Sequence, residues 1–145
     1  LYWIGLVSGY MMGRADRHFG PVINGKLTEI DKFGTRGIPP IYADIRRMAE
    51  FIESRGIRFW RMRPGDSLLE AGGDLIYCLA AEDEEYLVYF VNGGAASLRV
   101  PGGEAEWFNP RSGETREKTA VPEGRISFTA PDAEDWVLYI KVPQF

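Results

Sequence analysis

The sequence contains few of the residues from which small proteins build metal sites and nucleophilic active sites. Its 145 residues include one cysteine, Cys78, and one histidine, His18. A single cysteine cannot form an internal disulfide, and structural zinc sites need several cysteine or histidine ligands. The sequence has no phosphate-binding loop, zinc-protease motif, EF-hand spacing or nucleophile-elbow motif. It therefore predicts no metal, no cofactor and no catalytic residue.

A long hydrophobic run is also missing. The apolar start, LYWIGLVSGYMMG, is too short and too often interrupted by glycine to span a bilayer, so no membrane partner is expected. It has neither an initiator methionine nor a basic leader, and we expect the chain to be the C-terminal part of a longer protein. Cys78 lies in the apolar run 75–81, which predicts a buried, unreactive thiol. These features leave the cellular compartment open.

The net charge of −4 is unevenly distributed along the chain. Residues 1–65 carry 11 Lys and Arg against 6 Asp and Glu, whereas residues 66–145 carry 6 against 15. The basic residues are scattered and the second segment is acidic, which argues against nucleic-acid binding. The change of sign near Pro64 coincides with a change of pattern. The sequence therefore predicts two domains, residues 1–64 and residues 65–145.

The first segment predicts one clear helix. Residues 1–8 are apolar at nearly every position, as in a helix or strand buried on most sides. Residues 14–40 mix charge, glycine and proline without periodicity and predict a long loop. Residues 40–55 predict a helix, with prolines at its start and Gly56 as its C-terminal cap. Its apolar stripe consists of Ile41, Ile45, Met48, Ala49 and Ile52.

The second segment predicts strands and turns. Short runs rich in β-branched and aromatic residues alternate with turn signals such as Pro101-Gly102-Gly103 and Pro122-Glu123-Gly124. About seven strands without an intervening helix predict an antiparallel β-sandwich. The expected fold class is α+β, with this sandwich preceded by a helical end-piece. The predicted strands are residues 75–81, 85–91, 96–100, 105–108, 115–121, 125–129 and 136–142.

Clustered carboxylates are the first candidates for a site. Glu82, Asp83, Glu84 and Glu85 could hold a hard cation such as calcium. Adjacent carboxylates point in different directions and repel one another, however. The cluster therefore favours a solvated hairpin tip between two strands, and the same interpretation applies to the acidic residues at 132–135.

Exposed aromatic residues are the second candidates, because a row of them on one sandwich face would stack on sugar rings. Tyr86 and Tyr89 are three residues apart in a predicted strand and therefore face opposite sides. Trp107 and Phe108 are adjacent and also diverge, just before an Asn-Pro-Arg-Ser-Gly turn. The pattern favours core positions and makes the Trp107–Phe108 pair a hairpin anchor. The full set of candidates is Tyr86, Tyr89, Trp107, Trp136 and Tyr139.

Two motifs are specific enough to suggest a family. One is Trp-Phe-x-Pro-Arg-x-Gly, starting at Trp107, and the other is Pro-Asp-x-x-Asp-Trp-Val-Leu, starting at Pro131. Together with YWIGLVSGYMMG, the helix and the exit FWRMRPGDSLL, they resemble the C-terminal region of apiosidase-like glycoside hydrolases. The resemblance spans essentially the whole chain. It implies the end of a (β/α)8 barrel followed by a β-sandwich classed as a collagen-binding domain, in a bacterial, secreted or periplasmic parent.

The resemblance also locates the expected site. In such a barrel, residues 9–13 would be the last strand and residues 40–55 the closing helix. The paired catalytic carboxylates of glycoside hydrolysis would come from earlier strands, outside this sequence. Polar residues after the last strand would lie at the C-terminal mouth, where barrel enzymes bind substrates. The expected sugar contacts are Arg14, Asp16, Arg17 and His18, together with Trp107 on the sandwich.

The resulting functional prediction is a C-terminal accessory module of a carbohydrate-active hydrolase, which stabilises the barrel and contacts polysaccharide. Two alternatives stay open: an adhesion module that binds collagen or another extracellular ligand, and a purely structural domain. The expected partners are carbohydrate and the upstream barrel domain of the same protein. The apolar faces of residues 1–12 and of the helix also predict self-association.

Overall fold

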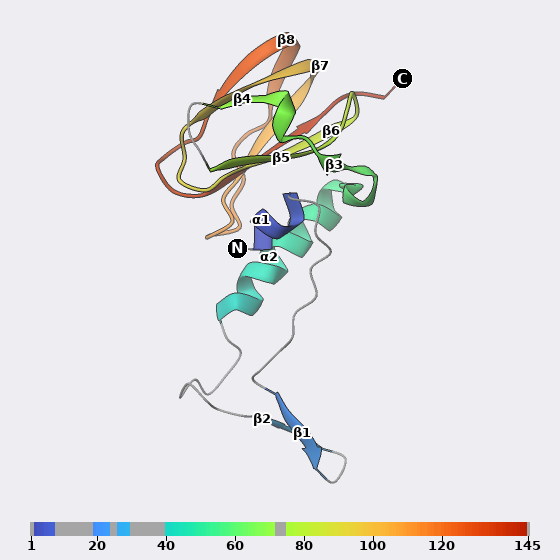
Figure 1. Cartoon of the computed structure of the whole chain (residues 1–145), viewed down its shortest axis with the longest axis vertical. Coiled ribbons are helices and arrows are strands. Elements are labelled where there is room, and N and C mark those ends of the chain that lie inside the picture. Colours follow the sequence, from blue (N-terminus) through green and yellow to red (C-terminus); the bar gives the residue numbers. More distant parts are fainter. Residues whose placement is uncertain (1, 8–18, 24–25, 30–39, 72–74, 145) are drawn as a thin grey trace.

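The computed structural model describes residues 2–7, 19–23, 26–29, 40–71 and 75–144 (Figure 1). The first segment contains helix α1 (Tyr2–Val7) and helix α2 (Pro40–Arg55). The predicted helix over residues 40–55 is confirmed, and Gly56 follows it with a φ of 61°, as a left-handed C-terminal cap requires. Within the described residues, no helix is long and apolar enough to cross a membrane.

The prediction of a featureless loop over residues 14–40 was wrong in part. Strands β1 (Phe19–Ile23) and β2 (Lys26–Glu29) pair as an antiparallel hairpin, in which Ile23 is opposite Lys26. The sequence carries a signal for this hairpin, because Asn-Gly, the dipeptide most typical of two-residue hairpin turns, stands between the two strands.

The second segment, together with the last two residues of the first, forms one seven-stranded sheet in the order β3-β5-β6-β9-β7-β4, with β8 paired to β7. All of its pairings are antiparallel, which confirms the predicted α+β class. Short 3-10 turns, η1 (Phe59–Arg61) and η2 (Asp66–Leu68), precede two short strands that the sequence did not reveal. The strands are β3 (Arg63–Pro64), β4 (Leu69–Ala71), β5 (Ile76–Ala81), β6 (Glu85–Phe90), β7 (Ala95–Phe108), β8 (Thr119–Thr129) and β9 (Trp136–Lys141).

The sheet becomes a sandwich because β7 and β8 bend together. Before the bend, residues 96–98 of β7 pair with β4; after it, residues 104–108 pair with β9, while β8 follows β7 across the bend. Figure 1 shows β4, β7 and β8 as a layer over β5 and β6. The prediction of turns at residues 101–103 and 122–124 was wrong. The two segments lie opposite each other in the β7–β8 ladder, where glycine and proline bend the strands without ending the pairing.

The middle of the sheet is buried on both faces. Residues of even number on β5, β6 and β9 point between the two layers of the sandwich, where Cys78, Val88 and Leu138 are almost fully buried. We call this the sandwich core. Burial raises the pKa of the Cys78 thiol to about 12, so the predicted unreactive thiol agrees with the structure.

Residues of odd number on the same strands form a second core beneath the helices, which we call the helix-side core. Leu87, Val137 and Tyr139 point toward α1 and α2, which lie directly below β5 and β6 in Figure 1. Strands buried on both faces read as nearly continuous apolar runs, which explains the sequences YLVYFV and WVLYI. The sandwich therefore needs the helices to cover its lower face.

The helices meet this core through residues that the predicted stripe only partly contains. Phe51 is the most buried described side chain of α2, at 3% exposure, although the stripe omitted it. Met48 and Ile52 are partly buried there, and α1 contributes Trp3 and Val7. The side chain of Ile41 lies outside those described. Self-association remains a prediction, but the sandwich of the same chain already covers these apolar residues.

The bend in β7 depends on Gly103. A Cβ at this position would lie 2.4 Å from the carbonyl oxygen of Lys141, and the residue has a φ of 146°. Gly124 on the facing strand has a comparable φ of 133° but open space around its Cβ position.

We therefore expect Gly103→Ala to lower the free energy of unfolding by about 3 kcal/mol or more, because it adds a backbone clash to the strain. The matched variant Gly124→Ala should lower it by about 1–2 kcal/mol through strain alone. Urea unfolding followed by circular dichroism measures both. Equal losses would show that the close approach to Lys141 does not constrain the bend.

Candidate functional site

Three arginines, spaced three residues apart over the end of α2 and the segment after it, meet three glutamates of the sandwich, two on strands and one in the β5–β6 turn. We call this contact, formed by Arg55, Arg58, Arg61, Glu84, Glu85 and Glu106, the arginine seam. The seam joins the basic first segment of the chain to the acidic second one. It gives the uneven charge distribution of the sequence a structural role.

The most buried pair of the seam is Arg55 with Glu106. The guanidinium donates from Nη2 to Glu106 Oε1 at 2.6 Å and from Nε to Oε2 at 3.1 Å, a bidentate arrangement. It also lies over the ring of Phe51, 5.0 Å from its centroid. The side chain of Glu106 is only 6% exposed. The hydrogen bond to Glu106 raises the pKa of Arg55, which keeps the guanidinium charged.

Glu85 is buried beside this pair. It is 2% exposed and accepts hydrogen bonds from the hydroxyl of Tyr139 at 3.0 Å and from the backbone N–H of Arg58 at 3.3 Å. The Arg58 guanidinium lies 3.6 Å from the same carboxylate. Burial, followed by the charge of Glu85, raises the pKa of Tyr139, which keeps its proton available for the hydrogen bond. A buried carboxylate thus has three partners.

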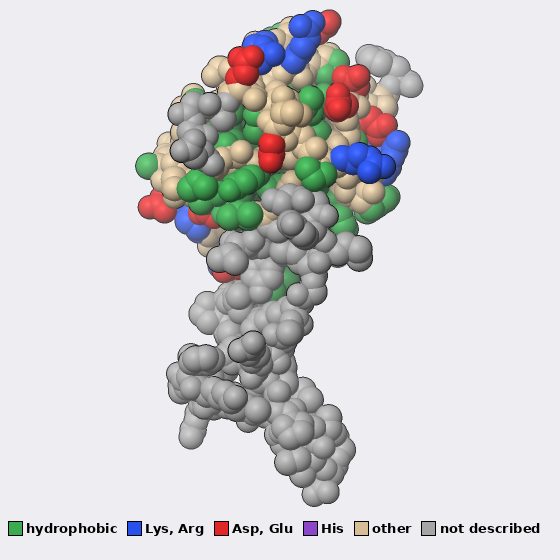
Figure 2. Space-filling view, viewed as in Figure 1, with side chains coloured by type: hydrophobic (Ala, Val, Ile, Leu, Met, Phe, Trp, Pro, Cys, Tyr) green, Lys and Arg blue, Asp and Glu red, His purple; other side chains and the backbone are tan. Residues whose placement is uncertain are grey.

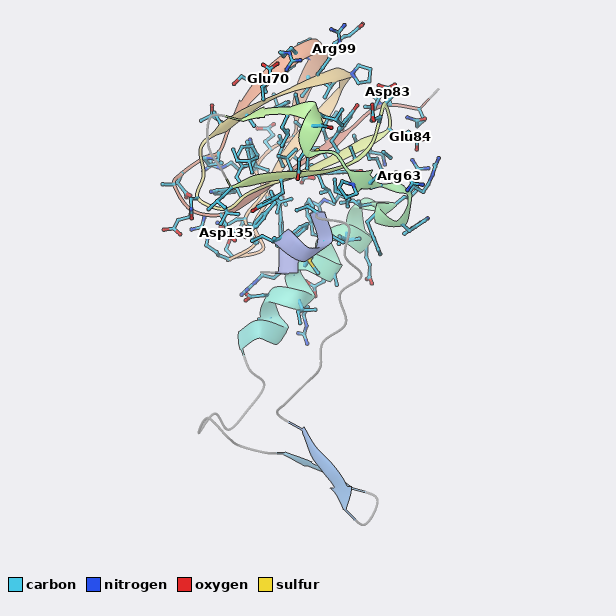
Figure 3. All side chains as sticks on the ribbon, viewed as in Figure 1. Arg63, Glu70, Asp83, Glu84, Arg99 and Asp135 are labelled. Atoms are coloured by element: carbon cyan, nitrogen blue, oxygen red, sulfur yellow. The ribbon has the colours of Figure 1, made fainter. Side chains whose placement is uncertain are left out.

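Glu84 completes the seam at the surface. It accepts from Arg58 at 2.9 Å and from Arg61 at 3.0 Å. The prediction of a fully solvated acidic tip over residues 82–85 was therefore wrong for Glu84 and Glu85. The sequence alone could not show this, because the arginines that neutralise them, Arg58 and Arg61, lie in the segment after α2, 23 to 27 positions earlier in the chain. Figure 3 shows Glu84 near Arg63 at the end of the sandwich where β3 begins.

A hollow of about 390 Å³ opens along the seam. It lies between Arg55 of α2 and the sheet residues Glu104, Glu106 and Lys141. Four of its charged groups form two pairs within the chain, since Lys118 lies 3.8 Å from Glu104 and Arg55 holds Glu106. Lys141 is a further charged residue in its lining. Carboxylates held by arginine are poorly suited to act as a general acid. The chemistry of the seam is therefore that of a polar contact between two parts of a fold.

The two sequence motifs meet at a second cluster, which we call the motif cluster. Arg111 of the first motif lies 3.1 Å from Asp135 and 3.5 Å from Asp132 of the second. The indole N–H of Trp136 donates to Asp132 at 2.8 Å, and this hydrogen bond lowers the pKa of Asp132. Arg111 and Arg116 both lie over the Trp136 ring. The motifs are therefore two halves of one loop-to-loop contact, and Asp135 lies across the sandwich from Glu84 in Figure 3.

Trp107 is the only predicted sugar contact within the described residues. It is half-buried against the sandwich core, with its ring 5.2 Å from Phe90 and 6.4 Å from Trp136. Phe108 points the other way and stacks on Phe51 at 4.2 Å, as expected for a hairpin anchor. The predicted contacts Arg14, Asp16, Arg17 and His18 lie outside the described residues, as does the predicted barrel strand 9–13.

Clusters that could hold a metal ion are also absent from the part of the chain that the structure describes. On the face shown in Figure 2, acidic and basic side chains are interspersed over the sandwich and do not form a patch of one sign. Tyr86, Tyr89, Trp136 and Tyr139, which the sequence offered as an aromatic row, are each at most 5% exposed. The favoured core interpretation of these four residues is confirmed.

A family model described as "Putative collagen-binding domain of a collagenase" matches residues 67–141, just over half of the chain. The chain belongs to this family. The match covers the sandwich from η2 to the end of β9, so it includes both motifs and the acidic side of the arginine seam. Among curated proteins, no sequence matches this chain.

Solved structures with this fold include two glycoside hydrolases. One, titled "Glycoside hydrolase", is 14% identical to this chain, with a TM-score of 0.60 over 83% of this chain and 30% of its own. The other is a family 5 glycoside hydrolase from Bacteroides vulgatus ATCC 8482, 15% identical, with a TM-score of 0.59 over 71% of this chain and 24% of its own. The chain thus spans less than a third of either protein, and the likeness is one of fold.

The seam predicts a large difference between two arginine substitutions on α2. Arg55→Met leaves the buried Glu106 without its partner, and we expect the free energy of unfolding to fall by about 2 kcal/mol. This loss is below the 3–5 kcal/mol typical of fully buried pairs, because the Arg55 side chain is 26% exposed.

Arg47→Met is the matched control, since Arg47 pairs at 2.9 Å with Asp44, whose side chain is 57% exposed. We expect a loss below about 0.5 kcal/mol for this variant. Urea denaturation, which adds no ions, compares the two at one low salt concentration. Indistinguishable stabilities would mean that the seam contributes no more than an ordinary surface pair.

Proposed function

We propose that this chain is the C-terminal part of a glycoside hydrolase, in which residues 65–145 form an accessory β-sandwich and residues 1–64 end a (β/α)8 barrel. The observation that carries the proposal is the packing of α1 and α2 on the lower face of the sandwich. Those helices cover a face that would otherwise expose Leu87, Val137 and Tyr139. A sandwich built in this way is suited to dock on a helical layer.

The similarity to glycoside hydrolases over 83% and 71% of this chain supports the same proposal. Because the match covers only 30% and 24% of those proteins, most of such an enzyme would lie outside these residues. We infer that the catalytic carboxylates belong to that larger part. Among the described residues, the buried carboxylates are Glu85 and Glu106, and both are held by arginine.

In this proposal the sandwich stabilises the barrel. The aromatic contacts of Phe51 with Trp3, Phe108 and Tyr139 would continue the core of the barrel layer into the sandwich. The arginine seam would fix the angle at which the two parts meet, because bidentate guanidinium contacts are directional. Substrate contacts by Arg14, Asp16, Arg17, His18 and Trp107 remain part of the proposal.

The test is the reading frame that contains the codon for Leu1, together with the protein that it encodes. We expect a (β/α)8 domain ahead of α1, with two carboxylates at the C-terminal ends of its strands. We also expect the long protein to hydrolyse aryl glycosides and residues 1–145 alone not to do so. Deletion of residues 65–145 should lower its melting temperature. A reading frame without a barrel, or turnover by the present chain that Glu85→Gln abolishes, would overturn the proposal.

Collagen binding is a second candidate, favoured by the name of the family. An adhesion surface for a triple helix would need an extended aromatic or apolar trench. Among the described residues, the exposed large hydrophobic side chains are Phe59, Trp60 and Leu75, which is a small set. Saturable binding to immobilised type I collagen fibrils would favour this candidate over the accessory role.

A further inference from the structure

The exit from α2 exposes two adjacent aromatic rings, Phe59 and Trp60, which we call the aromatic platform. Trp60 is 70% exposed and Phe59 is 40% exposed. The two rings lie 5.4 Å apart, at an interplanar angle of 79°. The aromatic residues that the sequence suggested as sugar contacts are buried or half-buried in the structure. Phe59 and Trp60 were not among those candidates.

The aromatic platform is held rigidly. Two backbone hydrogen bonds close turn η1. The N–H of Arg61 donates to the carbonyl of Arg58 at 2.8 Å, and the N–H of Met62 donates to the carbonyl of Phe59 at 3.0 Å. Ile57 and Met62, on either side of the pair, are 1% and 7% exposed and are anchored in the helix-side core. A ligand would therefore meet two rings carried by a backbone turn that is already formed, so no entropy is lost in ordering the backbone on binding.

The seam adds polar groups beside the aromatic platform. Arg58 and Arg61 flank the pair in sequence, and Glu84 holds both guanidinium groups. A guanidinium has five N–H donors, and these two side chains are 36% and 47% exposed, so donors remain accessible to a ligand. The site thus combines a fixed aromatic face with fixed hydrogen-bond donors.

The size of the aromatic platform discriminates between two kinds of partner. Fully exposed Trp and Phe side chains present roughly 150–250 Å² each, so this pair offers on the order of 250 Å². A specific protein interface needs about 800 Å² from each partner, about three times as much. One or two sugar rings would match the available area, because the slightly positive C–H bonds of a pyranose pack on the negative face of an indole.

We propose that the aromatic platform binds the pyranose rings of a polysaccharide, with a ring stacked on Trp60 and its hydroxyls hydrogen-bonded to Arg58 and Arg61. This inference rests on the proposed function and gives the accessory module a glycan site at its junction with α2. It adds a site on the exit segment to the substrate contacts proposed above.

The test is affinity electrophoresis of the 145-residue chain in gels that each contain one soluble polysaccharide: hydroxyethyl cellulose, xyloglucan, arabinoxylan, galactomannan or polygalacturonate. We expect at least one of them to retard the wild-type chain. Trp60→Ala should weaken binding about tenfold or more, which corresponds to the loss of about 1.4 kcal/mol. Trp60→Tyr, which keeps a smaller aromatic face, should retain part of the affinity.

Leu75→Ala is the matched control, because Leu75 is 42% exposed and lies just before β5, at the opposite end of that strand from β3. It should migrate like the wild type in every gel. Trp60 is also the most exposed of the four tryptophans, so bound polysaccharide should protect the wild-type chain, but not Trp60→Ala, from acrylamide quenching.

Retardation by none of the five polysaccharides, or equal retardation of wild type and Trp60→Ala, would overturn the proposal. So would a concentration-dependent dimer in light scattering that Trp60→Ala abolishes, since it would assign the aromatic platform to a protein contact. These results leave the accessory role intact, because that role depends on the barrel in the reading frame. Conversely, a reading frame without a barrel would not change the gel result.

Discussion

The contact between Arg55 and Glu106 is the interaction on which the rest of the structure depends. Glu106 is buried on the strand that also presents Phe108 to the helices, so its charge must be neutralised from the helix side. Arg55, at the end of α2, reaches Glu106 while Phe51 on the same helix stacks on Phe108. The positions of α2, β7 and the aromatic cluster are therefore fixed together, and removing one partner would leave a buried charge.

This dependence follows from the two-sided burial of the sheet. Strands β5, β6 and β9 bury alternate residues in two different cores, and the helix-side core exists only where α1 and α2 cover it. Burying a Leu or Val side chain contributes about 1.5–3 kcal/mol, so leaving that face open would be costly. The arginine seam then restricts the orientation of the helices on the sheet, because its ion pairs join arginines of the helical segment to glutamates of the sandwich. The family match covers the acidic half of that contact, and the fold likeness to glycoside hydrolases extends to the basic half.

Much of the fold could be predicted from local patterns. Helix α2, the antiparallel sheet and the opposed directions of Trp107 and Phe108 follow from spacing and capping signals within a few residues of each other.

The bend at Gly103 could not be predicted, because proline and glycine signal a turn in sequence and only the facing strand shows that pairing continues. The buried roles of Glu85 and Glu106 were also missed, since their arginine partners are 27 and 51 positions away. The charge imbalance between the two segments was the available signal. The exposure of Trp60 depends on the three-dimensional packing of its neighbours, so no periodic pattern in the sequence predicts it.

The packing described above implies that the helical segment and the sandwich form one cooperative unit joined at the arginine seam. Native-state hydrogen exchange measured along the chain tests this cooperativity, because each amide reports the free energy of the opening that exposes it. For one cooperative unit, we expect amides in the last two turns of α2 to exchange with the same free energy as those of β6 and β9. A helix that detaches while the sandwich stays folded would instead give α2 amides that exchange at a free energy several kcal/mol lower, and the two parts would then be independent.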